Sequence, residues 1–130
     1  MREGRERGAV AVEFALLAPV LILLLLGIME FGRAYNVQIS LTNAAREGVR
    51  VMAITNDPEA ARSAVRNALG TLEPVLPNEK IDFTASAPAG AKTCSATAQI
   101  SVTVRYTLST MTGIAGPFAM RGQGAMLCGG

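Results

Sequence analysis

The sequence predicts an α+β fold in which a long N-terminal helix crosses a membrane and continues as a stalk, followed by a short helix and a small antiparallel sheet. Three observations predict it. Residues 9–29 carry a single charge, apolar residues recur at steps of three and four from Val37 to Met52, and apolar and polar residues alternate from Ser95 to Leu108. The chain has 130 residues, which leaves room for one small domain beside the apolar run.

The apolar run is predicted to be a transmembrane helix. The 21 residues from Ala9 to Met29 would form a helix of about 31 Å, which matches a hydrocarbon core of about 30 Å. In water, the rest of the chain could not bury a helix that is apolar all round. A cleaved secretory signal is the alternative, but the residues at the end of the run and just after it, Gly27 to Arg33, contain no clean Ala-x-Ala cleavage site. A retained anchor is therefore the favoured interpretation.

Two further features define this helix. Pro19 is interpreted as a kink or local unwinding and not as a helix end, because membrane helices tolerate proline when neighbouring groups satisfy the freed carbonyl. Arg2, Arg5 and Arg7 precede the run and favour a cytoplasmic N-terminus. We expect a single-pass protein of the cell membrane. Its predicted parts are a cytoplasmic leader (1–8), a transmembrane helix (9–29), a helical stalk (30–54) and an extracytoplasmic α+β domain (55–130).

Glu13 is a carboxylate at the edge of the most apolar stretch. It has two interpretations. It is either the last interfacial residue, reaching toward the headgroups, or an intramembrane charge that needs a partner. If a peptidase cuts after Gly8, the new amine of Ala9 lies one helical turn from Glu13. That amine, or the same amine of an adjacent subunit, would then pair with the carboxylate.

Three blocks of residues carry a family resemblance. Gly8 to Phe14, GAVAVEF, resembles the prepilin-peptidase site of Flp-class type IV pilins and pseudopilins, with a glycine before the cut and a glutamate and an aromatic residue at the fifth and sixth mature positions. The string that continues to Arg33, with LLAP and GIMEFGR, and the block LTNAAREGVR at 41–50 are similar to the TadE-like family of tight-adherence pilus assembly proteins.

The resemblance implies a pilin-like architecture and a pseudopilin-like membrane protein that is needed to make Flp/Tad pili for adhesion and biofilm formation. It implies cleavage by a prepilin peptidase between Gly8 and Ala9, and assembly contacts at Glu13 and Phe14. The implied partners are the membrane, the prepilin peptidase, other pilus or pseudopilin subunits and the Tad assembly machinery.

Beyond the membrane, small and apolar residues form one helical stripe that extends the first helix to about Ile54. The stripe consists of Val37, Leu41, Ala44, Ala45, Gly48, Val49 and Met52. Such a face needs a cover. The C-terminal domain folding back on it is the favoured interpretation, and contact with another subunit is the alternative.

The remaining elements are predicted from caps and alternation. Asp57 as N-cap, Pro58 at the first position and Gly70 as C-cap delimit a short helix. Its Arg62 and Arg66 are expected on a solvated face, with an anionic-lipid patch as the alternative. The expected strands span residues 80–86, 95–108 and, more weakly, 123–128, with a turn or loop at 113–117.

Cys94 and Cys128 are the only cysteines. In an oxidising compartment the simplest interpretation is a disulfide, which would contribute about 3 kcal/mol if it acts through chain entropy. Two buried free thiols are the alternative, and metal binding by two lone cysteines is disfavoured.

Composition argues against catalysis. The chain has no histidine, which excludes histidine-dependent triads and zinc–histidine sites, and its serines, threonines and acids form no nucleophile–base constellation. A net charge of +2 is too small to suggest a nucleic-acid surface. We expect no enzymatic activity, cofactor, metal, nucleic acid or small-molecule substrate. The alternatives to a pilus-assembly role are a single-pass membrane-anchored binding module, such as an adhesin or envelope sensor, and a secreted domain that loses its apolar run.

Overall fold

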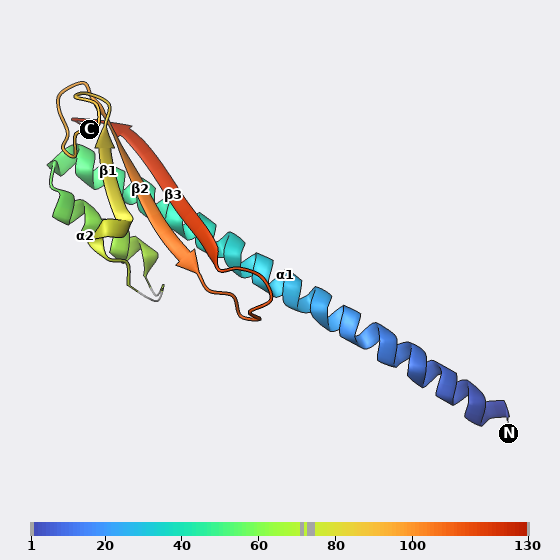
Figure 1. Cartoon of the computed structure of the whole chain (residues 1–130). Helices are drawn as coiled ribbons and strands as arrows, with labels where there is room; N and C mark the ends of the chain where they lie inside the picture. Colours follow the sequence, from blue (N-terminus) through green and yellow to red (C-terminus); the bar gives the residue numbers. More distant parts are fainter. Residues whose placement is uncertain (1, 71, 73–74, 130) are drawn as a thin grey trace. The chain divides into compact units, whose positions relative to one another are not determined.

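The structure is a computed structural model that describes residues 2–70, 72 and 75–129. The chain divides into two compact units, which we call the N-terminal helical segment (Met1–Arg33) and the α+β domain (Ala34–Gly130). The predicted α+β class is confirmed. The elements, in chain order, are α1 (Arg2–Thr55), α2 (Pro58–Leu69), the 3-10 turn η1 (Asn78–Lys80), β1 (Ile81–Ala85), β2 (Gln99–Leu108) and β3 (Phe118–Leu127) (Figure 1).

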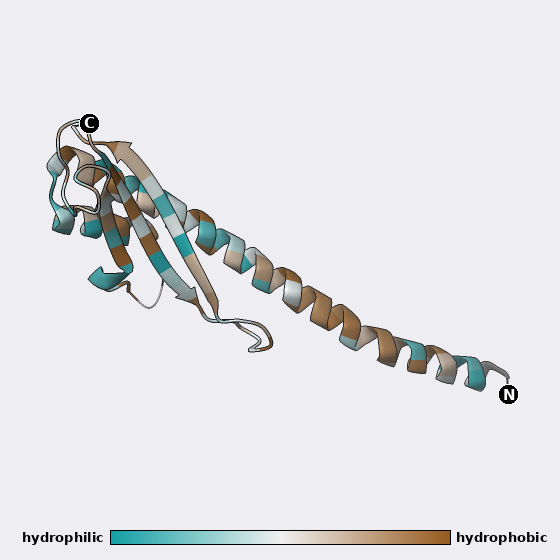
Figure 2. Ribbon diagram, turned by 45° about the horizontal axis from the view of Figure 1, so that its top comes forward, coloured by the Kyte–Doolittle hydropathy of each residue, from teal (hydrophilic) through white to brown (hydrophobic). Residues whose placement is uncertain are grey.

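The N-terminal helical segment exposes most of its apolar side chains. Between Val10 and Met29, the exposed large apolar residues have exposed fractions of 51% to 70%, and Figure 2 shows most of this stretch of α1 in the brown of hydrophobic residues. By length and composition it could cross a membrane. The helix continues through Pro19, so the prediction that this proline does not end the helix is confirmed, while local unwinding is not observed.

The sheet has the order β1-β2-β3, and both pairs of strands are antiparallel. Val102 in the central strand faces Phe83 in β1 and Gly124 in β3. One face of the sheet is buried, because alternate residues of β1 and β2 point toward the helices. The opposite face is polar and carries an ion pair between Arg105 and Asp82.

The predicted stripe of α1 forms one side of the core. All seven of its residues, Val37, Leu41, Ala44, Ala45, Gly48, Val49 and Met52, are buried. The apolar residues among them share one cluster with buried residues of α2, β1 and β2. The prediction that the C-terminal domain folds back on the stripe is therefore confirmed. A Cβ atom added to Gly48 would lie 2.3 Å from Val65 Cγ2, so this glycine lets α2 pack closely on α1.

The two long strands begin at different residues from those predicted. β2 starts at Gln99, because residues 95–98 form a turn in which the Ala98 N–H bonds to the Ser95 carbonyl and Thr97 has a φ of +66°. β3 starts at Phe118, several residues before the predicted strand, and pairs with the whole of β2. The predicted strand at 80–86 is confirmed as β1, and the predicted loop at 113–117 is also confirmed.

Two glycines bring β3 into backbone contact with α1. A Cβ atom on Gly122 would lie 2.2 Å from the Leu41 carbonyl oxygen, and one on Gly124 would lie 2.9 Å from the Ala45 carbonyl oxygen. Real Cβ atoms do not approach backbone this closely, so both positions require glycine. Within the α+β domain, β3 therefore runs in the same direction as α1, with no layer of side chains between them at these two points.

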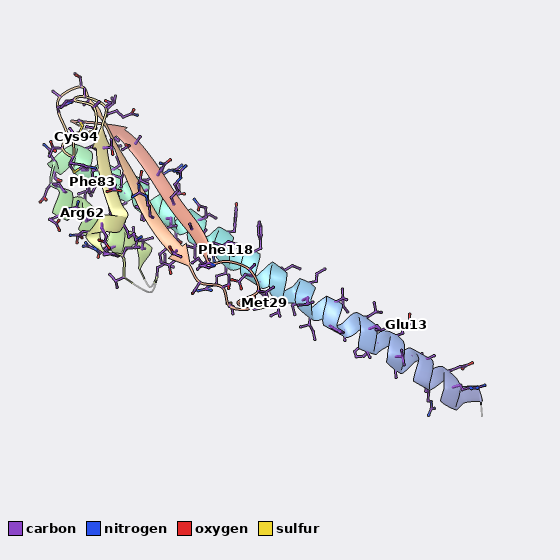
Figure 3. The ribbon with its side chains drawn as sticks, viewed as in Figure 1. Glu13, Met29, Arg62, Phe83, Cys94 and Phe118 are labelled. Carbon is purple, nitrogen blue, oxygen red and sulfur yellow. A yellow bond between two sulfur atoms is a disulfide. The ribbon has the colours of Figure 1, made fainter. Side chains whose placement is uncertain are left out.

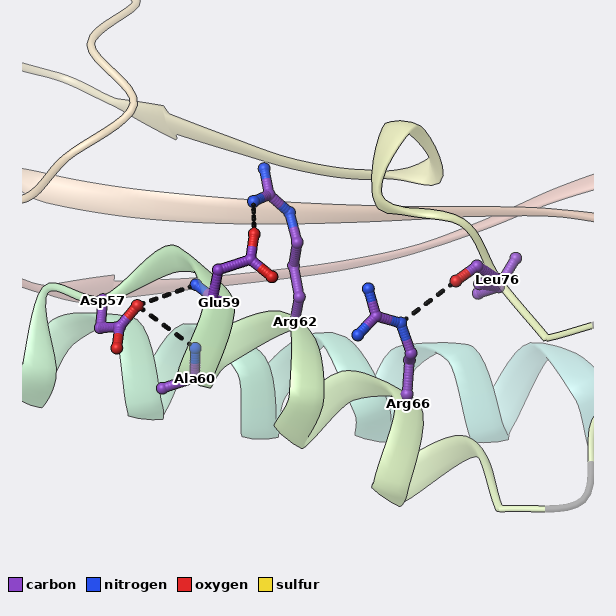
Figure 4. Close-up of polar contacts among 6 residues, drawn as sticks. All are labelled: Asp57, Glu59, Ala60, Arg62, Arg66 and Leu76. Carbon is purple, nitrogen blue, oxygen red and sulfur yellow. Dashed lines mark hydrogen bonds and ion pairs between the residues drawn. The ribbon is translucent and has the colours of Figure 1, made fainter.

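The ends of α2 follow the predicted capping. The Asp57 Oδ1 accepts hydrogen bonds from the backbone N–H groups of Glu59 (2.9 Å) and Ala60 (3.4 Å), as Figure 4 shows. Pro58 occupies the first position, where no intrahelical hydrogen bond is lost. Gly70 follows the last turn with a φ of +60°, a conformation that favours glycine. The predicted boundaries of this helix are confirmed.

The prediction that Arg62 and Arg66 lie on a solvated face is wrong. The Arg62 side chain is 24% exposed, pairs with Glu59 at 2.7 Å and lies over the Phe83 ring, 5.3 Å from its centroid (Figures 3 and 4). Arg66 donates its Nε–H to the Leu76 carbonyl oxygen at 3.2 Å. Long arginine stems cover apolar surface while their guanidinium groups reach polar partners, so the arginines connect α2 to β1 and to the chain before η1.

Candidate functional site

The residues predicted for processing and assembly lie on an exposed part of α1. Gly8, Ala9 and Glu13 are exposed, and Phe14 is 69% exposed. A Cβ atom on Gly8 would meet no atom within 4 Å, so the position is open to a larger side chain and to another protein. The whole predicted site therefore lies on an accessible helix surface.

The helix brings Ala9 and Glu13 to the same face. The two residues are four positions apart in an uninterrupted helix, and the Cα–Cβ bond of Glu13 tilts toward the helix N-terminus, in the direction of Ala9. The positions three residues before and four residues after Glu13 on the same helix face are apolar, and both of these residues, Val10 and Leu17, are more than half exposed. No residue that the structure describes pairs with Glu13. The arrangement thus combines a carboxylate in an apolar environment with a backbone nitrogen that cleavage would convert into an amine.

The two cysteines of the chain form the predicted disulfide. Cys94, in the loop before β2, forms a disulfide with Cys128, directly after β3, with a Cα–Cα distance of 5.6 Å. The Cys128 N–H also bonds to the Ala98 carbonyl at 2.8 Å. A bridge between residues 34 positions apart removes about 4 kcal/mol of loop-closure entropy from the unfolded chain if it acts through chain entropy.

Asn56 connects the end of α1 to this disulfide. It has a φ of +52°, a conformation that asparagine tolerates better than most residues. Its Nδ2–H donates to the Cys94 carbonyl oxygen at 3.2 Å, and its Oδ1 accepts from the Cys94 N–H at 2.6 Å. The Gly129 N–H bonds to the Ala53 carbonyl at 3.0 Å. The last turn of α1, the cysteine loop and the C-terminal residues therefore form one hydrogen-bonded end of the α+β domain.

Replacing Asn56 tests this connection. We expect Asn56→Ala to lower the free energy of unfolding by about 1–3 kcal/mol, because it loses two hydrogen bonds and strains the positive φ. Asn56→Gly retains the backbone freedom and loses only the hydrogen bonds, so it should cost less. Thermal unfolding of the oxidised full-length protein in detergent, followed by circular dichroism, measures both. Equal stability of Asn56→Ala and the unmodified protein would contradict the assignment.

Sequence reasoning missed several of these positions. Asn56 gave a usable signal, since an asparagine directly after a helix and before an Asp-Pro pair suits a left-handed helix end. Gly122 and Gly124 gave only a weak signal, because two glycines inside a strand indicate a close backbone approach without saying to which element. Within the ranges that the structure describes, no group of three or more His, Cys, Asp or Glu side chains could hold a metal ion.

Comparison with known proteins gives one match, to a part of the chain that contains the first of these predicted sites. Residues 8–50 match the family described as TadE-like protein, a range that contains Gly8, Ala9, Glu13 and Phe14. It also contains most of the α1 stripe that the α+β domain covers. No match is found among curated proteins or among solved structures. From Gly8 to Arg50, the chain is therefore similar to the TadE-like family.

Proposed function

We propose that this chain is a pseudopilin or minor-pilin-like membrane protein required for assembly of the Flp/Tad type IV pilus, and so for adhesion and biofilm formation. The TadE-like family is associated with this pilus. The observation that carries the proposal is the position of the Gly8–Phe14 block in α1, where it leads into a stretch, Val10 to Met29, whose large apolar side chains are mostly exposed. A helix of that kind needs lipid or other helices around it.

The proposed mechanism has two stages. A prepilin peptidase cuts between Gly8 and Ala9, which removes the basic leader and leaves a positively charged amine at Ala9. Glu13 then pairs with that amine, in the same chain or in an adjacent subunit, and Phe14 and the neighbouring apolar side chains pack laterally. Pairing makes an otherwise costly carboxylate tolerable in a medium of low dielectric constant, so assembly is favoured only where the amine and the carboxylate meet.

The α+β domain has a supporting role in this proposal. The Cys94–Cys128 disulfide suits an oxidising compartment, which supports placing residues 55–130 outside the cytoplasm and residues 1–8 inside it. The domain is built on α1 itself, through the stripe from Val37 to Met52. The proposal assigns no catalytic step and no cofactor to the chain.

A substitution at Gly8 tests the processing step. We expect Gly8→Leu to accumulate as the longer, uncut protein in the membrane, because a bulky side chain next to the scissile bond hinders the peptidase. Gly4→Leu is the matched control, since both glycines lie in α1 where an added Cβ atom would meet nothing within 4 Å; it should be processed normally. Intact-mass measurement of the membrane fraction distinguishes the two forms. Unchanged cleavage of Gly8→Leu would remove the peptidase from the proposal.

A further inference from the structure

The loop between β2 and β3, residues 109–117, lies at a definite end of the α+β domain. Gln38 donates its Nε2–H to the Arg121 carbonyl at 2.8 Å, and at the opposite end of β3 the Gly129 N–H bonds to the Ala53 carbonyl. β3 therefore begins beside the first residues of α1 within the domain and ends beside its last residues. We call the end of the domain where β3 begins, and where the chain arrives at Ala34, the near end. The end where β3 finishes, beside the last residues of α1, is the far end.

The near end is covalently tied to the apolar helix. Only residues 30–33 separate Met29, the last residue of the predicted transmembrane run, from Ala34, the first residue of the domain. Four residues reach at most about 14 Å even when fully extended. If residues 9–29 cross a bilayer, the near end of the domain is therefore held close to its surface.

The loop at this end is apolar and uncharged. Ile114 is 74% exposed, Met111 is 64% exposed, and Phe118 at the start of β3 is 37% exposed. Residues 106–120 contain no Asp, Glu, Lys or Arg. A charged surface would favour contact with headgroups alone, whereas an uncharged loop with protruding apolar side chains suits the boundary between the headgroups and the acyl chains.

The loop also satisfies its own backbone at the tip. The Gly113 N–H bonds to Thr110 Oγ1 at 3.1 Å, and the Ile114 N–H bonds to Thr112 Oγ1 at 3.4 Å. Unsatisfied amides are costly in an apolar environment. Hydroxyl groups that turn inward onto these amides lower the cost of bringing the tip into contact with lipid. Three independent features of the loop, namely its position, its composition and its internal hydrogen bonds, therefore favour contact with the lipid surface.

We propose that the 109–117 loop is a second membrane contact, in which the side chains of Ile114 and Met111 enter the headgroup boundary of the leaflet that faces the domain. The inference rests on the proposed membrane anchor. Its consequence is that the domain is held at two points, the helix and the loop, which restricts its tilt relative to the membrane.

The lack of tryptophan in the chain provides the test. In Ile114→Trp the indole is the only one present, and the full-length protein can be reconstituted in phosphatidylcholine vesicles with or without bromine atoms high on the acyl chains. Ile54→Trp is the matched control, because Ile54 is also an exposed apolar residue (63%) but lies at the far end. Leu23→Trp reports on the anchor itself.

We expect Leu23→Trp and Ile114→Trp to be quenched several-fold more strongly than Ile54→Trp, with a blue-shifted emission at position 114. Adding Met111→Ser to Ile114→Trp should reduce the quenching, which shows that native side chains and not the indole hold the loop in lipid. Quenching at position 23 without quenching at position 114 would overturn the loop contact and leave the anchor intact. A loop that contacts only another subunit would give this result. No quenching at either position would overturn the anchor and the loop contact together.

Discussion

Gly122→Val is expected to unfold the α+β domain or to leave it marginally stable. The new Cβ atom would lie 2.2 Å from the oxygen and 2.3 Å from the carbon of the Leu41 carbonyl, and 2.7 Å from the Thr42 nitrogen. These are backbone atoms of a buried helix, which cannot rotate away as a side chain can. Overpacking a core costs about 1–3 kcal/mol and occasionally more, and we expect a loss of at least about 3 kcal/mol here.

Two further variants calibrate this result. Gly124→Ala places its Cβ atom at 2.9 Å and 3.0 Å from the Ala45 carbonyl group, so its cost should be smaller. Gln123 lies between the two glycines, and its side chain is on the opposite face of the strand. Gln123→Ala loses only a long contact with Thr103 (3.4 Å), so it should change the free energy of unfolding by no more than about 0.5 kcal/mol. Denaturant unfolding in detergent measures all three. A Gly122→Val protein as stable as Gln123→Ala would mean that β3 does not lie on α1.

Glu13→Ala is expected to abolish or strongly reduce piliation while the protein remains in the membrane. Removing a carboxylate from the apolar helix makes insertion more favourable, by up to about 2.5 kcal/mol if the site lies at the bilayer centre and by less near the interface. An assembly contact, in contrast, disappears with the charge. The measurement is the amount of sheared surface pili from cells that carry the variant as their only copy, normalised to the amount of the protein in the membrane.

Glu6→Ala is the matched control for Glu13→Ala. Glu6 is an exposed glutamate of the same helix, but it lies before Gly8 and would be removed with the leader. Its replacement should leave pilus production unchanged. Normal piliation with Glu13→Ala would leave the carboxylate as an interfacial residue without a role in assembly.

The elements predicted correctly are those with a strong local signal. The α1 stripe repeats at helical spacing over more than four turns, and every one of its residues is buried. Asp57 and Pro58 mark the start of α2 by local chemistry alone, and Asp57 caps the helix. From Ala98 to Leu108, the alternation in and just before β2 predicts which side chains face the core.

The features that were missed depend on residues far apart in the sequence. Ser95 to Thr97 continue the alternation of β2, but a turn with a positive φ interrupts the strand. Arg62 looks solvated on a helical wheel, and only the position of Phe83 in the fold brings it under the sheet edge. β3 carries glycines where a strand normally shows its alternation, because the backbone of α1 occupies the space that side chains would fill.

The proposed role depends most directly on whether residues 9–29 stay in the membrane behind a newly formed N-terminus. Intact-mass and N-terminal analysis of the native protein, after separation of membrane and soluble fractions, tests both points at once. The account predicts a membrane-bound species that begins at Ala9 and contains the Cys94–Cys128 disulfide. A soluble species that has lost the entire apolar run would contradict it.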